Sequence, residues 1–269
     1  MAKETALEKG KTYSRMKILT LARDLQRRKA RERQGLFVAE GVRTVEELLR
    51  SPLEVHGALI GPQGNEGRRT ALIEAIRHRG IVTEEVGSSD FDSAAETESP
   101  QGILAIGVVP NRTLADLVVP STGPLRLLIL DAIQDPGNVG TIVRTAAAFG
   151  VSATICLPGT VDLWNAKVVR SAMGAQFHHS CLGSTWDEID SFRRERSISI
   201  WAADASGDPI DGFQPPARLG IVVGNEGAGL SPLSRARAER LVALPLSPNV
   251  ESLNVAVAAG ILLYELRQQ

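Results

Sequence analysis

The sequence predicts an α/β protein in two parts, the second a mostly parallel sheet covered by helices on both faces. Short apolar runs alternate with helical patterns along the whole chain, and in the second half these runs are continuous stretches of Val, Ile and Leu. The stretch 110–124, with three prolines and loose periodicity, indicates a boundary. We therefore expect a disordered tail over 1–12, a smaller α/β domain over 13–108, a linker over 109–124 and a larger domain over 125–269.

The first half contains alternating strand and helix patterns. GLFVAEG at 35–41 is typical of a strand, and Thr44 with Glu47 three residues later has the capping-box pattern that opens a helix over 45–51. Further along, the patterns predict a strand over 55–61, an amphipathic helix over 68–80, and strands over 81–87 and 102–109.

The second half repeats the alternation more strongly. Its patterns predict strands over 125–131, 152–157, 177–182, 197–205, 219–225 and 241–246, and helices over 138–150, 163–175, 231–241 and 255–266. Ligands of parallel sheets bind beyond the carboxyl ends of the strands, so the loops at those ends are where a functional site is expected.

The composition excludes several classes of protein. Hydrophobic residues make up 43% and charged residues 23% of the 269 residues, which is typical of a globular protein. No apolar run is long enough for a membrane span and the first residues lack the apolar core of a secretory signal, so we expect a cytoplasmic protein. Cys156 and Cys181 stand among apolar residues and are expected to be buried reduced thiols. No His, Cys or Asp cluster has ligand spacing, so no metal site is predicted.

A basic segment near the start offers a contact for nucleic acid. The net charge is only −1, yet residues 9–33 hold ten Lys and Arg residues against Asp24 and Glu32. Such a segment can neutralise phosphates and release counterions. We take Arg31 and, just beyond the segment, Arg43 as candidate RNA-binding residues. A solvated helix face explains such a charge run equally well.

The first loop with chemical character follows the predicted strand at 125–131. A Pro-Gly turn leads through Asn138 and Gly140 into a helix that carries Arg144. An ordinary turn and helix cap explain most of this pattern, with Asp135 or Asn138 as the N-cap. Arg144 fits that explanation poorly, because it stands on an otherwise small and apolar helix where a solvated face would normally carry more than one charge.

The second loop, GNEGAG at 224–229, places three glycines around Asn225 and Glu226 after a buried strand. Glycines there permit close approach of backbone to a ligand. The pattern is neither the dinucleotide fingerprint nor a phosphate-binding P-loop. Glu226 would repel a pyrophosphate, which favours a positively charged ligand or a role in proton handling.

The third loop, LPLSPNVESLN at 244–254, joins the last strand to the entirely apolar terminal helix. It carries more polar groups than a strand-to-helix turn needs. An N-cap by Asn249 or Ser252 explains one of them, but not both Ser252 and Asn254.

Taken together, the loops resemble a known family. The patterns N-x-G-x-x-x-R, V-x-G-x-E-G-x-G and P-x-x-x-x-x-x-S-L-N-V occur in the order and spacing of the SpoU, or TrmH-type, branch of the SPOUT RNA methyltransferases, and this likeness covers residues 125–267. The first half, with GLFVAEGVRTVEELL and SPQGILAI, is similar in a looser way to the ribosomal-protein-L30e-like substrate-binding domain of such ribosomal RNA methyltransferases.

The resemblance implies a fold and a cofactor. It implies a deep trefoil knot through which the C-terminal helix passes, a homodimer with the site near its interface, and S-adenosylmethionine held largely by backbone near Gly224, Leu244 and Leu253. The reaction it implies is methyl transfer to a ribose 2′-hydroxyl of RNA.

The resemblance also assigns roles to side chains. Arg144 is implied to act on the target ribose together with a substrate phosphate, and Asn138 to fix Arg144 or the ribose. Glu226, Ser252 and Asn254 match the remaining polar positions; for Ser252 a structural role is as good an explanation as a catalytic one. The extra N-terminal domain favours large-subunit (23S) ribosomal RNA as the substrate. A transfer RNA substrate, an antibiotic-resistance methylase and an inactive RNA-binding module remain alternatives.

Overall fold

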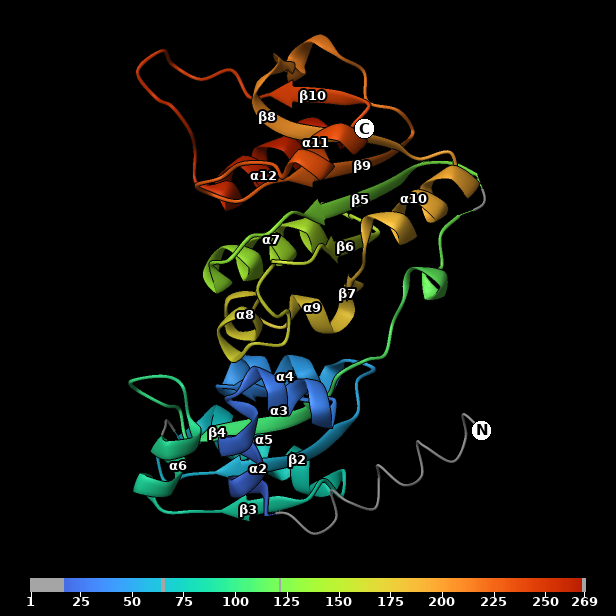
Figure 1. Ribbon diagram of the computed structural model, residues 1–269. Helices are drawn as coiled ribbons and strands as arrows, with labels where there is room; N and C mark the ends of the chain where they lie inside the picture. Colours follow the sequence, from blue (N-terminus) through green and yellow to red (C-terminus); the bar gives the residue numbers. More distant parts are fainter. Residues whose placement is uncertain (1–16, 64–65, 121, 268–269) are drawn as a thin grey trace. The chain divides into compact units, whose positions relative to one another are not determined.

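The computed structural model describes residues 17–63, 66–120 and 122–267, and the chain divides into two compact units (Figure 1). The main division follows Pro110, apart from the short stretch Trp164–Ala166, which groups with the first unit. Both units combine helices with a sheet, so the predicted α/β class is confirmed. The predicted tail over 1–12 lies outside the described residues, and the trefoil knot stays a prediction.

The first unit is a mixed four-stranded sheet with strand order β1-β4-β2-β3. Strand β4 runs antiparallel to β1 and β2, and β3 runs parallel to β2. The apolar side of α2 packs with strand residues and Phe91 in one core. The strands are β1 (Leu36–Glu40), β2 (Val55–Ile60), β3 (Thr83–Glu85) and β4 (Ile103–Val108), and the helices are α2 (Ile18–Leu25), α3 (Arg28–Gln34), α4 (Val42–Arg50), α5 (Glu66–His78) and α6 (Ser88–Ala94).

The start of α4 differs from the prediction. Thr44 is buried inside the helix and does not cap it, so the predicted capping box is wrong. The helix begins directly after Gly41, whose φ of +93° belongs to the left-handed region that favours glycine. The backbone N–H of Val42 donates to Gln101 Oε1 at 2.8 Å, so a side chain from the segment just before β4 satisfies the helix end.

The second unit contains a six-stranded sheet with strand order β10-β8-β9-β5-β6-β7, and every pair in it is parallel. This confirms the parallel sheet that the continuous apolar runs predict. Its strands are β5 (Leu125–Leu130), β6 (Ala153–Cys156), β7 (Cys181–Gly183), β8 (Ser199–Pro209), β9 (Arg218–Val223) and β10 (Arg240–Ala243).

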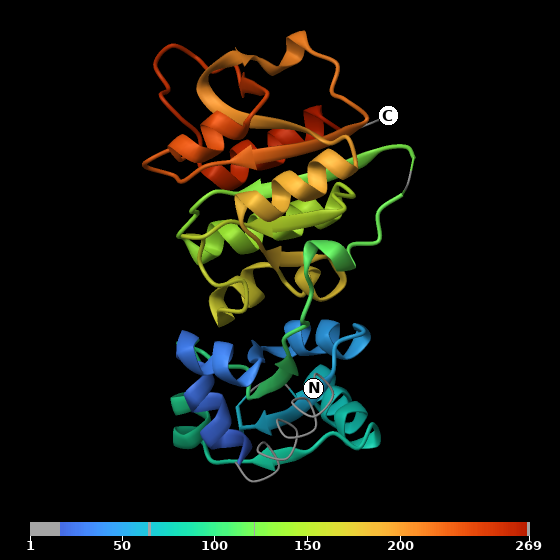
Figure 2. The ribbon, with the colours of Figure 1, turned by 45° about the vertical axis from the view of Figure 1, so that its right-hand side comes forward.

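Helices cover this sheet, with α7 and α10 on opposite sides of it in Figures 1 and 2. Helix α10 buries Trp186, Ile189 and Phe192 in a core with the strands. Leu114 and Leu117 join the same core, so part of the stretch expected as linker belongs to this unit. The helices are α7 (Pro136–Ala148), α8 (Ala166–Ser171), α9 (Ala175–His178), α10 (Trp186–Glu195), α11 (Pro232–Arg237) and α12 (Val255–Glu265), with 3₁₀ turns η1 (Leu114–Asp116) and η2 (Ile210–Gly212).

Between β6 and β8 the sequence prediction was partly wrong. The helix expected over 163–175 is only α8, because Met173 and Gly174 have left-handed φ values of +50° and +81° that no α-helix contains. The strand expected over 177–182 begins at Cys181, after α9. Helix α10 was missed, although Thr185 and Glu188 form the capping box that the sequence displays.

The two cysteines are free and buried, as the sequence predicts. Burial raises the pKa of the Cys156 thiol to about 12 and also raises the pKa of Cys181. Because only the thiolate is a good nucleophile, both are packing residues in this sheet.

Candidate functional site

Three loops of the second unit leave the same edge of the sheet. Strands β5 and β9 are parallel neighbours, and β8 connects β9 to β10 in the same direction. The segments after Leu130, Val223 and Ala243 therefore all begin at the carboxyl edge. These are the three segments that the sequence singles out.

The first loop is shaped by Asp135, which caps α7. Its Oδ1 accepts from the backbone N–H of Asn138 at 2.7 Å, and Pro136 occupies the first turn, where a missing N–H costs nothing. This cap places Asn138 in the first turn of the helix, with Arg144 six residues further along.

The second loop depends on Asn225, which the sequence prediction did not select. Its Oδ1 accepts from the N–H groups of Gly227 and Ala228 at 2.9 Å each, and its Nδ2 donates to the Ala132 carbonyl at 2.8 Å. The loop folds back so tightly that a Cβ on Gly224 would lie 2.5 Å from Gly229 carbonyl atoms. An Asn within a glycine-rich turn was the available signal, because its side chain readily bonds the backbone two residues on.

A second residue holds the glycine loop and was not selected by the sequence prediction. It is Asp131, which is buried directly after β5. Its Oδ2 accepts from the N–H of Ser231 at 2.7 Å, and Ser231 in turn caps α11. The fully buried Ser234 of that helix accepts from Trp186 Nε1 at 3.0 Å. The glycine loop is thereby fixed at both of its ends.

The third loop ends at Asn254, which caps α12. Its Oδ1 accepts from the N–H of Ala256 at 2.9 Å and of Val257 at 3.4 Å. The cap is therefore neither Asn249 nor Ser252. Ser252 is exposed and has no hydrogen-bond partner among the described residues, so it does not hold this loop in place.

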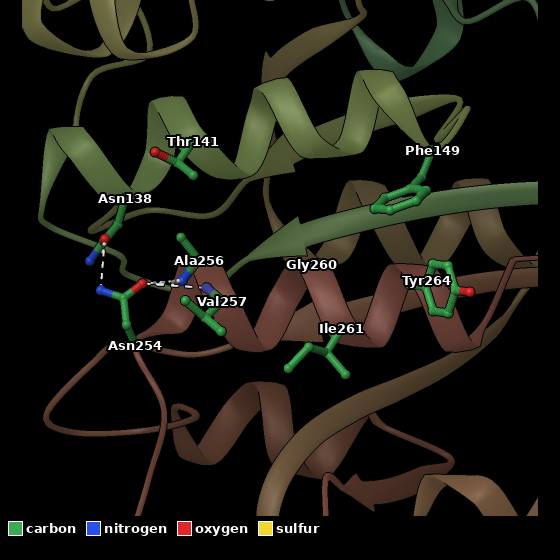
Figure 3. A pocket seen from close by; sticks show the side chains of 9 residues that line it. All are labelled: Asn138, Thr141, Phe149, Asn254, Ala256, Val257, Gly260, Ile261 and Tyr264. Atoms are coloured by element: carbon green, nitrogen blue, oxygen red, sulfur yellow. Dashed lines mark hydrogen bonds between the residues drawn. The ribbon is translucent and has the colours of Figure 1, made fainter.

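A chain of hydrogen bonds joins the three loops. Asn254 Nδ2 donates to Asn138 Oδ1 at 3.0 Å, and Asn138 Nδ2 donates to Glu226 Oε1 at 2.8 Å (Figure 3 shows the first of these bonds). Backbone N–H groups can only donate, so the cap fixes the orientation of the Asn254 amide, and each later amide must follow. Glu226 consequently ends the chain as an acceptor, with its other carboxylate oxygen unused by the described residues.

A cavity of about 750 Å³ lies between the second and third loops. Gly224, Leu244 and Leu253, the predicted cofactor residues, all line it, together with Glu226 and Ser252. A volume of this order suits a nucleoside-sized ligand. S-adenosylmethionine fits these residues: the glycine turn exposes backbone, and the lining carboxylates of Glu226 and Glu251 suit a cationic ligand.

Arg144 lies on the exposed side of α7, apart from the hydrogen-bonded chain. Its Nη1 donates to the sulfur of Met173 at 2.9 Å, and no carboxylate of the described residues pairs with it. Asn138 therefore bonds Glu226 and Asn254 and not Arg144, contrary to one of the roles expected for it. The remaining N–H groups of the guanidinium can donate to a further acceptor.

The two candidate RNA-binding residues of the first unit differ. Arg31 is 4% exposed, and its Nη1 donates to the backbone carbonyls of Leu25 at 2.8 Å and Gln26 at 2.9 Å. The expectation that Arg31 contacts RNA is therefore wrong, because its guanidinium closes the turn between α2 and α3. Arg43 is exposed in the first turn of α4 and is accessible to a phosphate.

Two absences concern the described residues alone. No group of three or more His, Cys, Asp or Glu among them could hold a metal ion. None of the helices within residues 17–63, 66–120 and 122–267 is long and apolar enough to cross a membrane.

Comparison with known families agrees with this arrangement. The model of the SpoU rRNA methylase family matches residues 126–264, and the model of the MRM3-like substrate binding domain matches residues 17–105. The first covers half of the chain and includes all three loops. The chain belongs to the SpoU rRNA methylase family.

Relatives of this chain are similar along nearly its whole length. It is 35% identical to the 23S rRNA (guanosine(2553)-2′-O)-methyltransferase RlmP of Bacillus subtilis (strain 168), over 90% of this chain and 93% of that protein. It is 32% identical to the 23S rRNA (guanosine-2′-O-)-methyltransferase RlmB of Salmonella typhi, over 85% and 97% respectively. An AdoMet-bound rRNA methyltransferase from Sinorhizobium meliloti has a TM-score of 0.81 and 26% identity, with 93% and 94% of the two chains covered.

Proposed function

We propose that this protein transfers a methyl group from S-adenosylmethionine to a ribose 2′-hydroxyl of 23S ribosomal RNA. The observation that carries the proposal is the hydrogen-bonded chain from Asn254 through Asn138 to Glu226, beside a cavity lined by the predicted cofactor residues. The names of the relatives, both 23S rRNA 2′-O-methyltransferases, supply the substrate class.

The chemistry asks for alignment and charge stabilisation. The cofactor supplies a methyl group on a positively charged sulfur, which is already a good electrophile. The ribose hydroxyl is the weak partner, so the protein must place its oxygen in line with the methyl carbon and relieve it of its proton. No metal is needed for either task.

Arg144 and Glu226 suit the two tasks. A guanidinium is protonated at any ordinary pH, so Arg144 is assigned to hold a substrate phosphate and stabilise the developing alkoxide, not to act as a base. Glu226 is a carboxylate whose Oε1 is occupied by Asn138, and its other oxygen is directed by that bond. We assign it to orient the hydroxyl or accept its proton.

The first unit supports ribosomal RNA over transfer RNA as the substrate. Its match to a substrate-binding domain accounts for residues 17–105, which the methyltransferase chemistry does not require. Arg43 is the exposed side chain that we assign to RNA in this unit. With ribosomal RNA as the substrate, we place the activity in the cytoplasm.

A homodimer through α7 and α12 forms part of the proposal. Helix α12 is apolar on every side, yet Val257, Ile261 and Tyr264 are 51%, 39% and 48% exposed. With Phe149 they line a groove of about 570 Å³ between the two helices, which reaches Asn138 and Asn254 (Figure 3). A helix that is apolar all round is normally covered, and a second copy of this face would cover it next to the site.

The dimer predicts a selective effect of charge on this groove. Ile261→Glu should give a monomer in light scattering at micromolar concentration and lower methyl transfer at least about tenfold, because a buried unpaired carboxylate opposes association. Leu233→Glu, at an exposed apolar residue of α11, is the matched control and should leave a dimer. An Ile261→Glu variant that remains dimeric would remove this face from the interface.

The function is tested by incorporation of labelled methyl groups. The protein is incubated with labelled S-adenosylmethionine and, in separate reactions, with unmodified 23S rRNA, 16S rRNA and transfer RNA. The proposal predicts label in 23S rRNA alone, at a nucleotide that resists alkaline cleavage because its 2′-oxygen is blocked. Label in transfer RNA would correct the substrate, and tight RNA binding without transfer would favour an inactive module.

A further inference from the structure

Met173 contacts Arg144 from a backbone conformation that is unusual for its residue type. Its φ of +50° lies in the left-handed region, where a side chain costs of the order of 1 kcal/mol, and it is followed by Gly174 at +81°. The side chain is 36% exposed, so core packing does not explain why the strained turn carries a methionine. Its Sδ accepts from Arg144 Nη1 at 2.9 Å.

The turn that carries Met173 is pressed against the helix that carries Arg144. A Cβ on Gly140 would lie 2.5 Å from Ser171 Cβ and 2.7 Å from the Val168 carbonyl oxygen, so α8 approaches α7 at this glycine as closely as backbones allow. Gly140 is the third of the seven positions of the first loop motif, between Asn138 and Arg144. The glycine and the left-handed turn together bring the thioether over the guanidinium.

A thioether is an uncommon partner for arginine, and its weakness has a consequence. Sulfur in methionine is a weak, neutral acceptor, whereas a carboxylate would hold the guanidinium strongly and cancel its charge. The contact engages Nη1 alone, and four further N–H groups of the five in a guanidinium can face a substrate.

We propose that Met173 is a positioning residue that anchors Arg144 without neutralising it. The long arginine side chain is held over the site before RNA binds, which lowers the entropy lost on reaching the transition state. Its full positive charge stays available for the phosphate or the developing alkoxide. This inference rests on the function proposed above for Arg144.

Three substitutions at this exposed residue separate anchoring from charge. Met173→Leu keeps the size and removes the acceptor, and should lower kcat about fivefold with the KM for RNA within about twofold. Met173→Gln supplies a neutral oxygen acceptor and should restore kcat to within about twofold of the parent. Met173→Glu has the same shape as the Gln variant but neutralises Arg144, and should lower kcat at least about twentyfold.

A second pair of variants serves as the control for backbone strain. Met173→Gly and Ser197→Gly each place glycine at an exposed residue with a φ of +50°. Both should fold with melting temperatures within about 3 °C of the parent, because the relief of strain offsets the extra entropy of the unfolded chain. Only Met173→Gly should lose turnover, to the level of the Leu variant.

The outcomes distinguish this inference from the proposed function. A Leu variant with parental kcat, or Gln and Glu variants with equal kcat, would overturn the anchoring role and leave that of Arg144 intact. An active Arg144→Ala variant would overturn both.

Discussion

The basic segment of the first unit and the three loops of the second use polar side chains in opposite ways. Among the described residues of the segment, Arg27 and Arg33 both pair with Asp24, and Arg28 pairs with Glu32 at 2.7 Å, all within ten residues. In the loops, Asn138 bonds Glu226 across 88 residues of sequence and Asn254 across 116.

The difference shows where sequence-level charge misleads. A run of cations looks like a nucleic-acid contact, yet much of its charge is used to stabilise two short helices and the turn between them. The polar residues of the loops look sparse along the sequence and meet only in the folded sheet. Convergence of distant side chains is therefore better evidence of a site than local charge density.

The largest expected effect is a loss of activity, and it is tested by replacing one arginine from each region. Arg144→Ala should lower kcat by about a hundredfold or more, because a cation at developing charge is worth several kcal/mol, while the dissociation constant for S-adenosylmethionine stays within about twofold. Arg28→Ala is the matched control, since it removes an arginine already paired with Glu32. Equal activity of the two variants would abolish the distinction between the regions.

The next effect concerns the hydrogen-bonded chain itself. Asn138→Ala should lower kcat about thirtyfold, because Glu226 and Asn254 lose their shared partner. Asn138→Asp should lose at least as much, since a carboxylate cannot donate to Glu226 and repels it. Asn249→Ala, at an exposed asparagine of the third loop, is the control. Steady-state kinetics with both substrates measure the losses. An Asn138→Asp variant with the parental kcat would show that the hydrogen-bonded chain does not direct Glu226.

A buried polar pair in the second unit contributes stability that depends on pH. His179 accepts from or donates to the Thr154 hydroxyl at 2.9 Å, and burial lowers the pKa of the imidazole to about 4. Its folded-state pKa lies below the unfolded value near 6.5, so the stability it contributes is complete above that value and is lost as pH falls toward 4.

The expected loss of stability from this histidine is about 3 kcal/mol between pH 7 and pH 4. Urea unfolding across that range should show a flatter pH dependence for His179→Gln than for the parent, with exposed His178→Gln as the control. Parallel curves for the parent and His179→Gln would contradict a depressed pKa.

The smallest expected effect is a change in RNA affinity when an ion pair of the basic segment is removed. Asp24 accepts from Arg27, Arg33 and Gln34, so Asp24→Asn should destabilise the first unit by about 1 kcal/mol and raise its net positive charge. RNA affinity should then increase, by less than about threefold at physiological salt, because cations formerly paired become available. Filter binding measures the change, and weaker RNA binding would mean that the ion pairs orient these arginines for RNA.

Part of this structure followed from the sequence because its causes are local. Continuous apolar runs predicted the strands of the parallel sheet, and the residue types before α7 predicted Asp135 as one of two possible caps. The burial of Arg31 could not be predicted, because it depends on two carbonyl groups that only the turn between α2 and α3 presents. The early end of α8 depends likewise on a left-handed methionine, which sequence patterns disfavour.

The candidate site followed the same division. The motifs singled out Asn138, Arg144, Glu226 and Asn254, whereas their partners depend on tertiary structure. Asn225 left a local signal, an asparagine within a glycine-rich turn, whereas the bond of Asp131 to Ser231 depends on tertiary structure.

The function proposed for this site, methylation of one ribose of 23S rRNA, is tested most directly by mapping of 2′-O-methyl groups in cells. The RNA is compared between cells that carry the intact protein, cells that lack it and cells that carry Arg144→Ala. We predict one 23S rRNA ribose that is methylated only with the intact protein. Identical 2′-O-methylation of 23S rRNA in all three would contradict the account.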